Sequence, residues 1–253
     1  MPTQRFDFTG AQGQRLAGRL DAPDGPPVAY ALFAHCFTCG MDVLAASRLA
    51  GALTARKLAV LRFDFTGLGA SDGEFGNGGF TSNVEDLVAA AAALREAGTP
   101  PALLIGHSLG GAAVLAAAGA IAETRAVVTI GAPFEASHVL LLFKDQIAEI
   151  ESRGEAVVRL DGRPFTIRRR FIDDLRGQSQ AERVAALHKA LLVMHSPTDA
   201  VVGIQNAADI FQHARHPKSF VSLVDADHLL RRRTDADYVA GVIAAWITRY
   251  LTI

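Results

Sequence analysis

The feature that most constrains the fold is a regular alternation of short apolar runs with longer amphipathic stretches. The apolar runs have the length of buried strands and lie at 28–34, 58–63, 101–106, 126–131, 190–195 and 218–224. Between most of them lie alanine- and leucine-rich stretches with a helical period, at 42–56, 82–97 and 109–122, and another follows at 235–251. Strands that alternate with helices pair in parallel, and strands that are apolar throughout lie in a sheet covered on both faces. The pattern predicts an α/β fold with a mostly parallel sheet.

Two segments carry local signals of their own. The opening stretch, FDFTG followed by QRLAGRLDAP, predicts an antiparallel hairpin that starts the sheet. Ser82 and Glu85 have the spacing of a capping box, which places the start of the second helix at residue 82. Gly98, followed by Pro100, is a typical stop signal for the same helix.

The alternation breaks between residues 134 and 188. This segment is more polar, with a helical pattern at 138–152 and two β-rich runs, AVVRL and RPFTI, joined by Asp161 and Gly162. An Asp-Gly pair favours a tight turn, so the runs predict a two-stranded ribbon. A segment this long between two core strands exceeds a simple connection. The sequence therefore predicts a single domain, 1–253, with an inserted cap at about 134–188.

Composition and charge restrict the partners. Half of the residues are hydrophobic, the net charge is −1 and no long basic stretch is present, which argues against nucleic acid or an anionic membrane as partner. The start of the chain lacks a signal-peptide pattern, and no apolar run approaches the length of a membrane span. We expect a soluble, cytoplasmic protein that binds a small molecule. The arginines at 231–233 are explained most simply as a solvated face, with attraction of an acidic substrate as the alternative.

The stretch LLIGHSLGGAA contains a G-x-S-x-G motif between a predicted strand and a predicted helix. In that context the motif predicts a sharp turn that exposes the hydroxyl of Ser108 above the sheet. Gly106 and Gly110 remove side chains that would collide there. The turn also places Ser108 near the positive N-terminus of the following helix, where developing negative charge is stabilised. Ser108 is therefore the candidate nucleophile.

A serine nucleophile needs a base that takes its proton and an acid that orients the base. In this architecture the acid and then the histidine follow the serine, each on a loop after a strand. Asp199, in SPTDAVV, follows the run at 190–195. His228, in DADHLL, follows the run at 218–224. We therefore predict a catalytic triad of Ser108, Asp199 and His228.

Other acids and histidines compete with these candidates. Asp225 and Asp227 are alternative orienting acids, but they share the loop of His228, and an acid from the neighbouring strand fits the geometry better. His107, directly before the serine, is expected to pack or to orient the turn. His35 and His195 are expected to be structural, because one begins a loop and the other ends a strand.

The whole chain resembles the α/β-hydrolase superfamily, in particular serine esterases and S33-like members. The resemblance is carried, in family order, by HCFTCG, RFDFTGLGASDGEF, GHSLGGAA, HSPTDAVV and DADHLL. Several of these pieces are most similar to the hydrolase half of bacterial proteins that fuse an α/β-hydrolase to an OsmC-type thiol peroxidase domain. The resemblance implies an eight-stranded, mostly parallel sheet covered by helices on both faces.

The same resemblance implies a reaction. It implies transfer of an acyl group to water through an acyl-serine intermediate, without a cofactor, and most simply hydrolysis of carboxylic esters with small to medium acyl chains. It also implies that the backbone N–H groups of Phe37 and Leu109 form the oxyanion hole. Thioesters, amides or peptides are alternative substrates of the same triad, and a non-catalytic hydrolase-like protein is a further alternative. A homodimer and an association with a separate OsmC-type protein stay open.

Both cysteines of the chain, Cys36 and Cys39, flank Phe37 in a Cys-x-x-Cys pattern. Many family members carry His-Gly where this chain carries His35-Cys36. No second pair with metal-ligand spacing accompanies the cysteines, so no metal site is expected. The simplest interpretation is that both thiols pack in the loop, and a primary thiol redox activity is an alternative. A further alternative is regulation, in which a Cys36–Cys39 disulfide clamps the loop and misaims the Phe37 amide.

Overall fold

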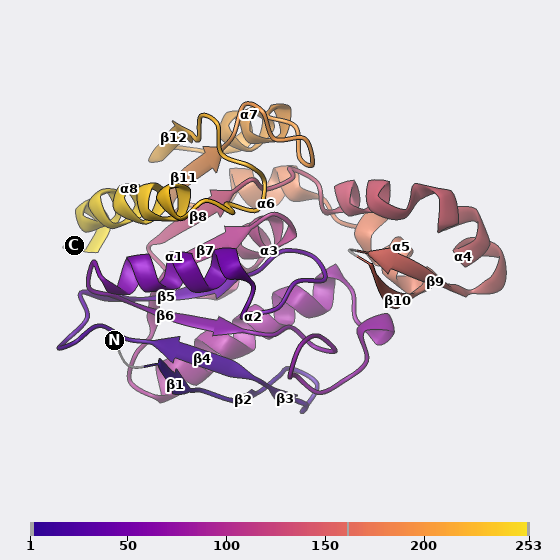
Figure 1. Ribbon diagram of the computed structural model, residues 1–253, viewed down its shortest axis with the longest axis horizontal. Coiled ribbons are helices and arrows are strands. Elements are labelled where there is room, and N and C mark those ends of the chain that lie inside the picture. Colours follow the sequence, from indigo (N-terminus) through magenta and orange to yellow (C-terminus); the bar gives the residue numbers. More distant parts are fainter. Residues whose placement is uncertain (1–2, 161, 252–253) are drawn as a thin grey trace.

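The computed structural model describes residues 3–160 and 162–251. Within them, eight strands form one sheet in the order β1-β4-β6-β5-β7-β8-β11-β12 (Figure 1). From β6 to β12 all neighbouring strands run parallel, and β4 is antiparallel to both β1 and β6. The bounds are Thr3–Arg5 (β1), Gly18–Asp21 (β4), Ala29–Ala34 (β5), Leu58–Phe63 (β6), Pro101–His107 (β7), Ala126–Ile130 (β8), Ala190–His195 (β11) and Lys218–Ser222 (β12). The predicted mostly parallel sheet is confirmed.

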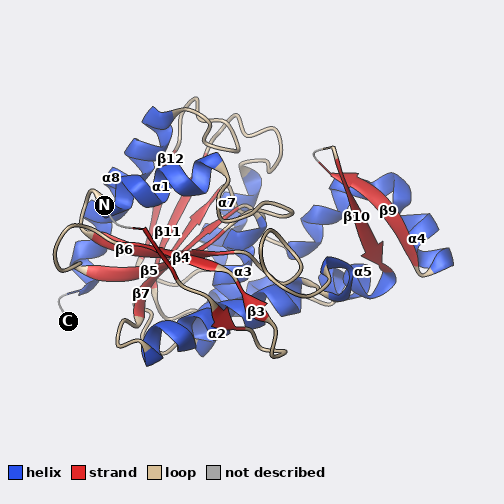
Figure 2. Cartoon of the chain, turned by 60° about the horizontal axis from the view of Figure 1, so that its bottom comes forward, coloured by secondary structure: helices blue, strands red, loops and turns tan. Residues whose placement is uncertain are grey.

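Helices cover both faces of the sheet, which explains why its strands are apolar throughout (Figures 1 and 2). On one face α1 packs beside α8, and on the other lie α2, α3 and α7. Their bounds are Leu44–Thr54 (α1), Phe80–Glu96 (α2), Leu109–Ala117 (α3), Gln205–His213 (α7) and Arg233–Leu251 (α8). No helix in the described part of the chain is both long enough and apolar enough to cross a membrane.

Successive residues of the strands point alternately into two separate cores. In β7, Leu103 and Ile105 belong to the core under α1 and α8, whereas Leu104 belongs to the core under α2 and α3. All three side chains are fully buried. This alternation follows from the two-residue period of a strand. The central strands are therefore fixed on both sides, and the loops that leave their carboxyl ends start from rigid positions.

The segment between β8 and β11, residues 134–188, is called the insertion here. It contains the predicted ribbon, whereas the helix predicted at 138–152 is a 3₁₀ segment with a kink at Phe143 followed by a short α-helix. It comprises η3 (Ala136–Gln146), α4 (Ile147–Arg153), the antiparallel ribbon β9 (Glu155–Leu160) and β10 (Arg163–Arg168), α5 (Arg169–Arg176) and α6 (Gln180–Ala185). Figure 1 shows α4, α5 and the ribbon projecting beyond the end of the sheet. The ribbon is where the sequence predicts it; Asp161, predicted to form its turn, lies outside the described residues.

Two boundary expectations differ from the structure. The hairpin at the start of the chain, β2 (Phe8–Thr9) and β3 (Arg15–Leu16), forms a small ladder of its own, and β1 and β4 supply the edge of the main sheet. Helix α2 begins at Phe80, two residues before the predicted start. Ser82 lies in its first turn, and its Oγ accepts a hydrogen bond from the Gly79 N–H at 2.8 Å. Ser82 therefore satisfies a helix-end amide from inside the helix.

Two short 3₁₀ segments flank these helices: η1 (Phe75–Asn77) precedes α2, and η2 (Ala118–Ala120) follows α3.

Two glycines, Gly110 in α3 and Gly119 just after it, differ sharply in the space around them. A Cβ atom on Gly110 would collide with the backbone carbonyl oxygens of Ala34 and His35, whereas one on Gly119 would meet open space. Helix α3 therefore packs directly against the backbone at the end of β5.

We predict that Gly110→Ala lowers the free energy of unfolding by about 1–3 kcal/mol, because backbone carbonyl groups cannot move aside as a side chain can. Gly119→Ala is the matched control, and its effect should stay within about 0.5 kcal/mol of the wild type or be stabilising. Urea denaturation of the three proteins measures both effects. Equal stability of the Gly110 variant and the wild type would contradict the close approach of α3 to β5.

Candidate active site

Ser108 occupies the sharp turn between β7 and α3. Its backbone has φ 54° and ψ −127°, a strained conformation for a residue with a side chain, at a cost of about 1–3 kcal/mol. The Ser108 N–H donates to the carbonyl of Ile130 at 2.9 Å, and the Ser108 carbonyl accepts from the Gly111 N–H at 2.8 Å. A Cβ atom on Gly106 would collide with the Gly110 carbonyl. The strained turn is therefore held from both sides, and the G-x-S-x-G motif has the context that the sequence predicts.

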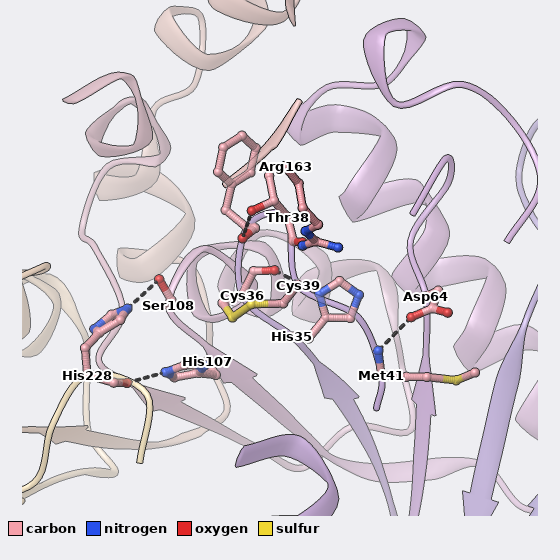
Figure 3. Close-up of a disulfide and its surroundings, with 11 residues drawn as sticks. His35, Cys36, Thr38, Cys39, Met41, Asp64, His107, Ser108, Arg163 and His228 are labelled. Carbon is pink, nitrogen blue, oxygen red and sulfur yellow. Dashed lines mark hydrogen bonds between the residues drawn. A yellow bond between two sulfur atoms is a disulfide. The ribbon is translucent and has the colours of Figure 1, made fainter. Parts of the chain in front are cut away.

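The side chains of Ser108, His228 and Asp199 form one hydrogen-bonded chain. His228 Nε2 lies 3.0 Å from Ser108 Oγ, and His228 Nδ1 lies 2.7 Å from Asp199 Oδ2 (Figure 3 shows the first contact). An ionised carboxylate can only accept, so Nδ1 carries the proton and Nε2 is free to accept the serine proton. The structure thus brings together the three residues that the sequence predicts as a triad.

Asp199 is held as an ionised acceptor. Its side chain is 1% exposed, and its Oδ1 accepts the amide N–H groups of Val201 and Val202 at 2.8 and 2.9 Å. Burial alone raises the pKa of Asp199, but the hydrogen bonds from His228 and from these two amides outweigh it, so the pKa lies below its ordinary value. Asp199 therefore stays negative and keeps the proton of His228 on Nδ1.

The two alternative acids point elsewhere. Asp227 accepts the backbone N–H of Arg231 at 2.9 Å and lies 3.8 Å from its guanidinium group. Asp225 is exposed, and its carbonyl accepts from Arg232. Among the described residues, Asp199 is the carboxylate that contacts the ring of His228. The geometry favours Asp199 over both competitors.

Two buried histidines bind the loops that carry His228 and Asp199. His107 Nε2 donates to the His228 carbonyl at 2.7 Å (Figure 3), and His195 Nε2 donates to the Val202 carbonyl at 2.7 Å. Burial, reinforced by the neighbouring His228, lowers the pKa of His107 to about 4. Burial also lowers the pKa of His195. Both rings are therefore neutral near pH 7, and each ties the end of a strand to the backbone of a neighbouring loop.

This role of His107 was only partly expected. The sequence predicts that it packs or orients the serine turn, and the ring does lie 5.2 Å from the ring of His228, centroid to centroid. Its hydrogen bond, however, reaches a loop 121 residues away. His35, also predicted to be structural, donates from Nδ1 to the carbonyl of Cys36 at 2.9 Å. The partner of His107 has no local sequence signal, because strand order brings the His228 loop beside it, whereas the partner of His35 is the next residue in the chain.

The two amides expected to form an oxyanion hole border the same site. Phe37 lies on the loop after β5, and Leu109 is the first residue of α3. No hydrogen-bond acceptor among the described residues pairs with either amide. The Phe37 ring stacks on Phe171 of the insertion at 5.7 Å between centroids. The loop thus leaves the amide available and anchors the side chain on the insertion.

A cavity of about 410 Å³ opens onto Ser108 and His228. Its walls are largely apolar and come from the insertion, the Phe37 loop and the loop after β11, with Val139, Leu142, Leu160 and Val201 among them. Among the described lining residues, Arg159 of β9 and Arg231 are the ones with a permanently charged side chain. No group of three or more potential metal-ligating side chains occurs in residues 3–160 and 162–251. The arrangement suits an apolar substrate with a polar group at its outer end.

The low pKa of His107 predicts a pH-dependent stability. Unfolding returns the pKa of this ring to about 6.5, so between pH 6.5 and about 4 the His107 ring is protonated in the unfolded chain and neutral in the folded one. The free energy of unfolding should fall between pH 6.5 and about 4, by roughly 3 kcal/mol from this ring. Urea denaturation at several pH values should show a shallower fall in His107→Gln than in the wild type. The exposed His213, changed to Gln, is the matched control, and parallel curves for His107→Gln and wild type would contradict the prediction.

Known proteins share this architecture. Residues 31–244 match the model of the alpha/beta hydrolase family. The esterase domain of a Rhodothermus marinus protein is 48% identical and has a TM-score of 0.79, with 99% of this chain and 100% of that domain covered. Est1E from Butyrivibrio proteoclasticus, solved with ferulic acid, is 18% identical (TM-score 0.75; 99% and 100% covered). A serine hydrolase without a lid from Xanthomonas campestris is 22% identical (TM-score 0.68; 100% and 98% covered).

The last two likenesses show the fold alone, because the sequence identities are low. No curated protein matches the chain significantly. The family model, however, spans the sheet from within β5 to β12 and the loops that carry Ser108, Asp199 and His228. Together with the esterase domain at 48% identity, it confirms the resemblance to the α/β-hydrolase superfamily, whereas the closer similarity to OsmC-fused hydrolases stays a prediction. The chain belongs to the alpha/beta hydrolase family.

Proposed function

We propose that this protein is a serine hydrolase that cleaves carboxylic esters of small to medium acyl chains through an acyl-serine intermediate. The observation that carries the proposal is the hydrogen-bonded chain from Ser108 through His228 to Asp199, which opens onto an apolar cavity. The 48% identity to a domain described as an esterase supports the ester-hydrolase class. The triad roles below are part of this proposal.

In the first half of the reaction Ser108 Oγ attacks the ester carbonyl carbon. His228 Nε2 accepts the serine proton as the new C–O bond forms, and Asp199 stabilises the resulting imidazolium. The carbonyl oxygen becomes an oxyanion, and the unpaired amides of Phe37 and Leu109 are the donors for it. The removal of one such donor typically costs about 10²–10³-fold in rate. His228 then gives its proton to the leaving alcohol.

In the second half a water molecule takes the place of the alcohol. His228 removes a proton from the water, which attacks the acyl-serine carbonyl, and then returns the proton to Ser108 Oγ. Because Asp199 stays ionised, His228 keeps the same tautomer at the start and the end of the cycle. Both halves require that Nε2 of His228 carries no proton at the start, and the bond from His228 Nδ1 to Asp199 favours that tautomer.

The size of the acyl group follows from the cavity. Its volume of about 410 Å³ lies at the lower end of the range for small-molecule sites. Val139 and Leu142 of the insertion form part of its wall, so in our proposal the insertion acts as a cap over the acyl chain of a single 1–253 domain. A cytoplasmic location, an association with an OsmC-type protein and a homodimer stay predictions.

The test is hydrolysis of a series of p-nitrophenyl esters from acetate to laurate, run on wild type and Ser108→Ala. We expect kcat/KM to pass through a maximum at short or medium chains, and Ser108→Ala to lower kcat by about 10⁴-fold or more. A parallel series of thioesters and anilides separates the alternative acyl-transfer activities. Hydrolysis by Ser108→Ala with a kcat close to that of the wild type would contradict the proposal.

The two cavity arginines predict a preference for a negative charge at the far end of the acyl chain. p-Nitrophenyl hydrogen glutarate should have a kcat/KM about 2- to 5-fold above that of the neutral valerate ester, since exposed charge pairs contribute little. Arg159→Gln or Arg231→Gln should reduce this ratio, and added salt should do the same. Arg233→Gln is the matched control, because Arg233 is exposed and pairs with an acidic side chain as Arg231 does, but is not among the residues that line the cavity. An unchanged ratio in both cavity variants would contradict the prediction.

A further inference from the structure

Cys36 and Cys39 are joined by a disulfide in the loop that carries Phe37, so the expectation that both pack as free thiols is wrong. Both residues line the cavity together with Ser108, and Figure 3 shows the disulfide beside Ser108 and His228. The bond closes a ring of chain that contains only two further residues, Phe37 and Thr38. One of these two carries the proposed oxyanion donor. A change at the disulfide therefore acts directly on the backbone next to the reaction.

Thr38 is strained inside this ring. Its φ of 58° lies in the left-handed region, which a β-branched residue rarely adopts. Such a conformation persists only where the surrounding structure imposes it. Three hydrogen bonds restrain it: Thr38 Oγ1 donates to the Phe37 carbonyl at 2.7 Å, the Cys39 N–H donates to the Cys36 carbonyl at 3.1 Å, and Arg163 of the insertion donates to the Thr38 carbonyl. The disulfide is the covalent restraint.

The two ends of the loop are held independently of the disulfide. His35 Nδ1 donates to the carbonyl of Cys36 at 2.9 Å. Beyond Cys39, the Met41 N–H donates to the buried carboxylate of Asp64 at 2.6 Å (Figure 3). Loss of the disulfide would therefore leave the ends in place and release the strained centre. The centre is the part that aims the Phe37 amide.

We propose that Cys36 and Cys39 form a redox modification site that sets the activity of the hydrolase, with the disulfide form active and the dithiol form weakened. This inference rests on the proposed ester hydrolysis and adds a regulation of the same site. The sequence alone left open the opposite direction, in which the disulfide misaims the amide. The strained Thr38 decides between them, because the disulfide holds a conformation that the reduced loop has reason to leave.

The oxidant is a hydroperoxide, and the chemistry balances with the two thiols alone. One cysteine thiolate attacks the terminal oxygen of the hydroperoxide, the O–O bond breaks, and the alkoxide leaves and takes up a proton to become an alcohol. The sulfenic acid formed is then attacked by the second cysteine, which yields the disulfide and water. Two thiols and one hydroperoxide thus give one disulfide, one alcohol and one water. A thiol or phosphine reductant reverses the change.

The cavity is the route by which reagents reach the sulfur atoms. Cys36 is buried, with 6% of its surface exposed, and Cys39 is half-buried, but both border the cavity. Small peroxides and phosphines fit this space. An acyl-serine in the cavity should shield the pair, so the rate of reduction should fall when Ser108 is blocked by a fluorophosphonate.

The experiment compares the two redox forms of the wild-type protein. One sample is reduced with a phosphine and desalted, and the other is oxidised with hydrogen peroxide; a thiol titration counts two thiols and none, because the chain has only these two cysteines. We expect the reduced form to hydrolyse p-nitrophenyl butyrate with a kcat about 10-fold or more below that of the oxidised form, with little change in KM. The oxyanion donor acts in the transition state, so kcat carries the loss.

Variants separate the loop from a general effect of the reagents. The double variant Cys36→Ser/Cys39→Ser should resemble the reduced wild type and ignore both reagents. Thr38→Gly is the informative companion, because glycine adopts a positive φ without strain, so reduction should lower its kcat much less. A loss of kcat as large in Thr38→Gly as in the wild type would overturn the role of the strained residue.

The outcomes distinguish this inference from the proposed function. An equal kcat in the two redox forms, or a higher one in the reduced form, would overturn the inference and leave the esterase proposal standing. A protein that still titrates with two thiols after peroxide treatment would also overturn the inference. If neither form hydrolyses any ester of the series, the proposed function fails and this inference fails with it.

Discussion

Parallel pairing of the central strands is the constraint on which the rest of the structure depends. Because β5, β7, β11 and β12 run in the same direction, the loops that follow them all leave from one edge of the sheet. Ser108 and His228 are 120 residues apart in the chain and meet at 3.0 Å, and Asp199 reaches His228 from the neighbouring strand. The apolar runs that build the sheet thus also bring the three residues of the candidate triad together.

A second layer of buried polar groups fixes the loops in place. His107 ends β7 and His195 ends β11, and each donates to a loop carbonyl rather than to a side chain. Asp199 in turn accepts two amides of its own loop. Since burial keeps both rings neutral, this layer adds directional bonds beside His228 without adding charge that would compete with Asp199. The two neutral histidines therefore do not weaken the interaction between Asp199 and His228.

The sequence predicts the parts of this structure that depend on local patterns. The run at 190–195 coincides with β11, and the motif around Ser108 sits on the expected turn because strain, glycines and helix start are all encoded within a few residues. The start of α2 was misplaced by two residues, since Ser82 can bond a helix-end amide from either side of the boundary. The bond from Arg163 to Thr38, across 125 residues, has no local signal at all. Such contacts depend on how the insertion packs against the loop that follows β5.

That contact between the insertion and the Phe37 loop couples the position of the insertion to the position of the Phe37 amide. Arg163 holds the Thr38 carbonyl, and Phe171 stacks on Phe37, so the ribbon and α5 touch both residues within the disulfide ring. Any movement that lifts the insertion to admit a molecule must break these contacts. Under the proposed function, an arrangement with the insertion lifted would lack two restraints on the loop that carries the Phe37 amide.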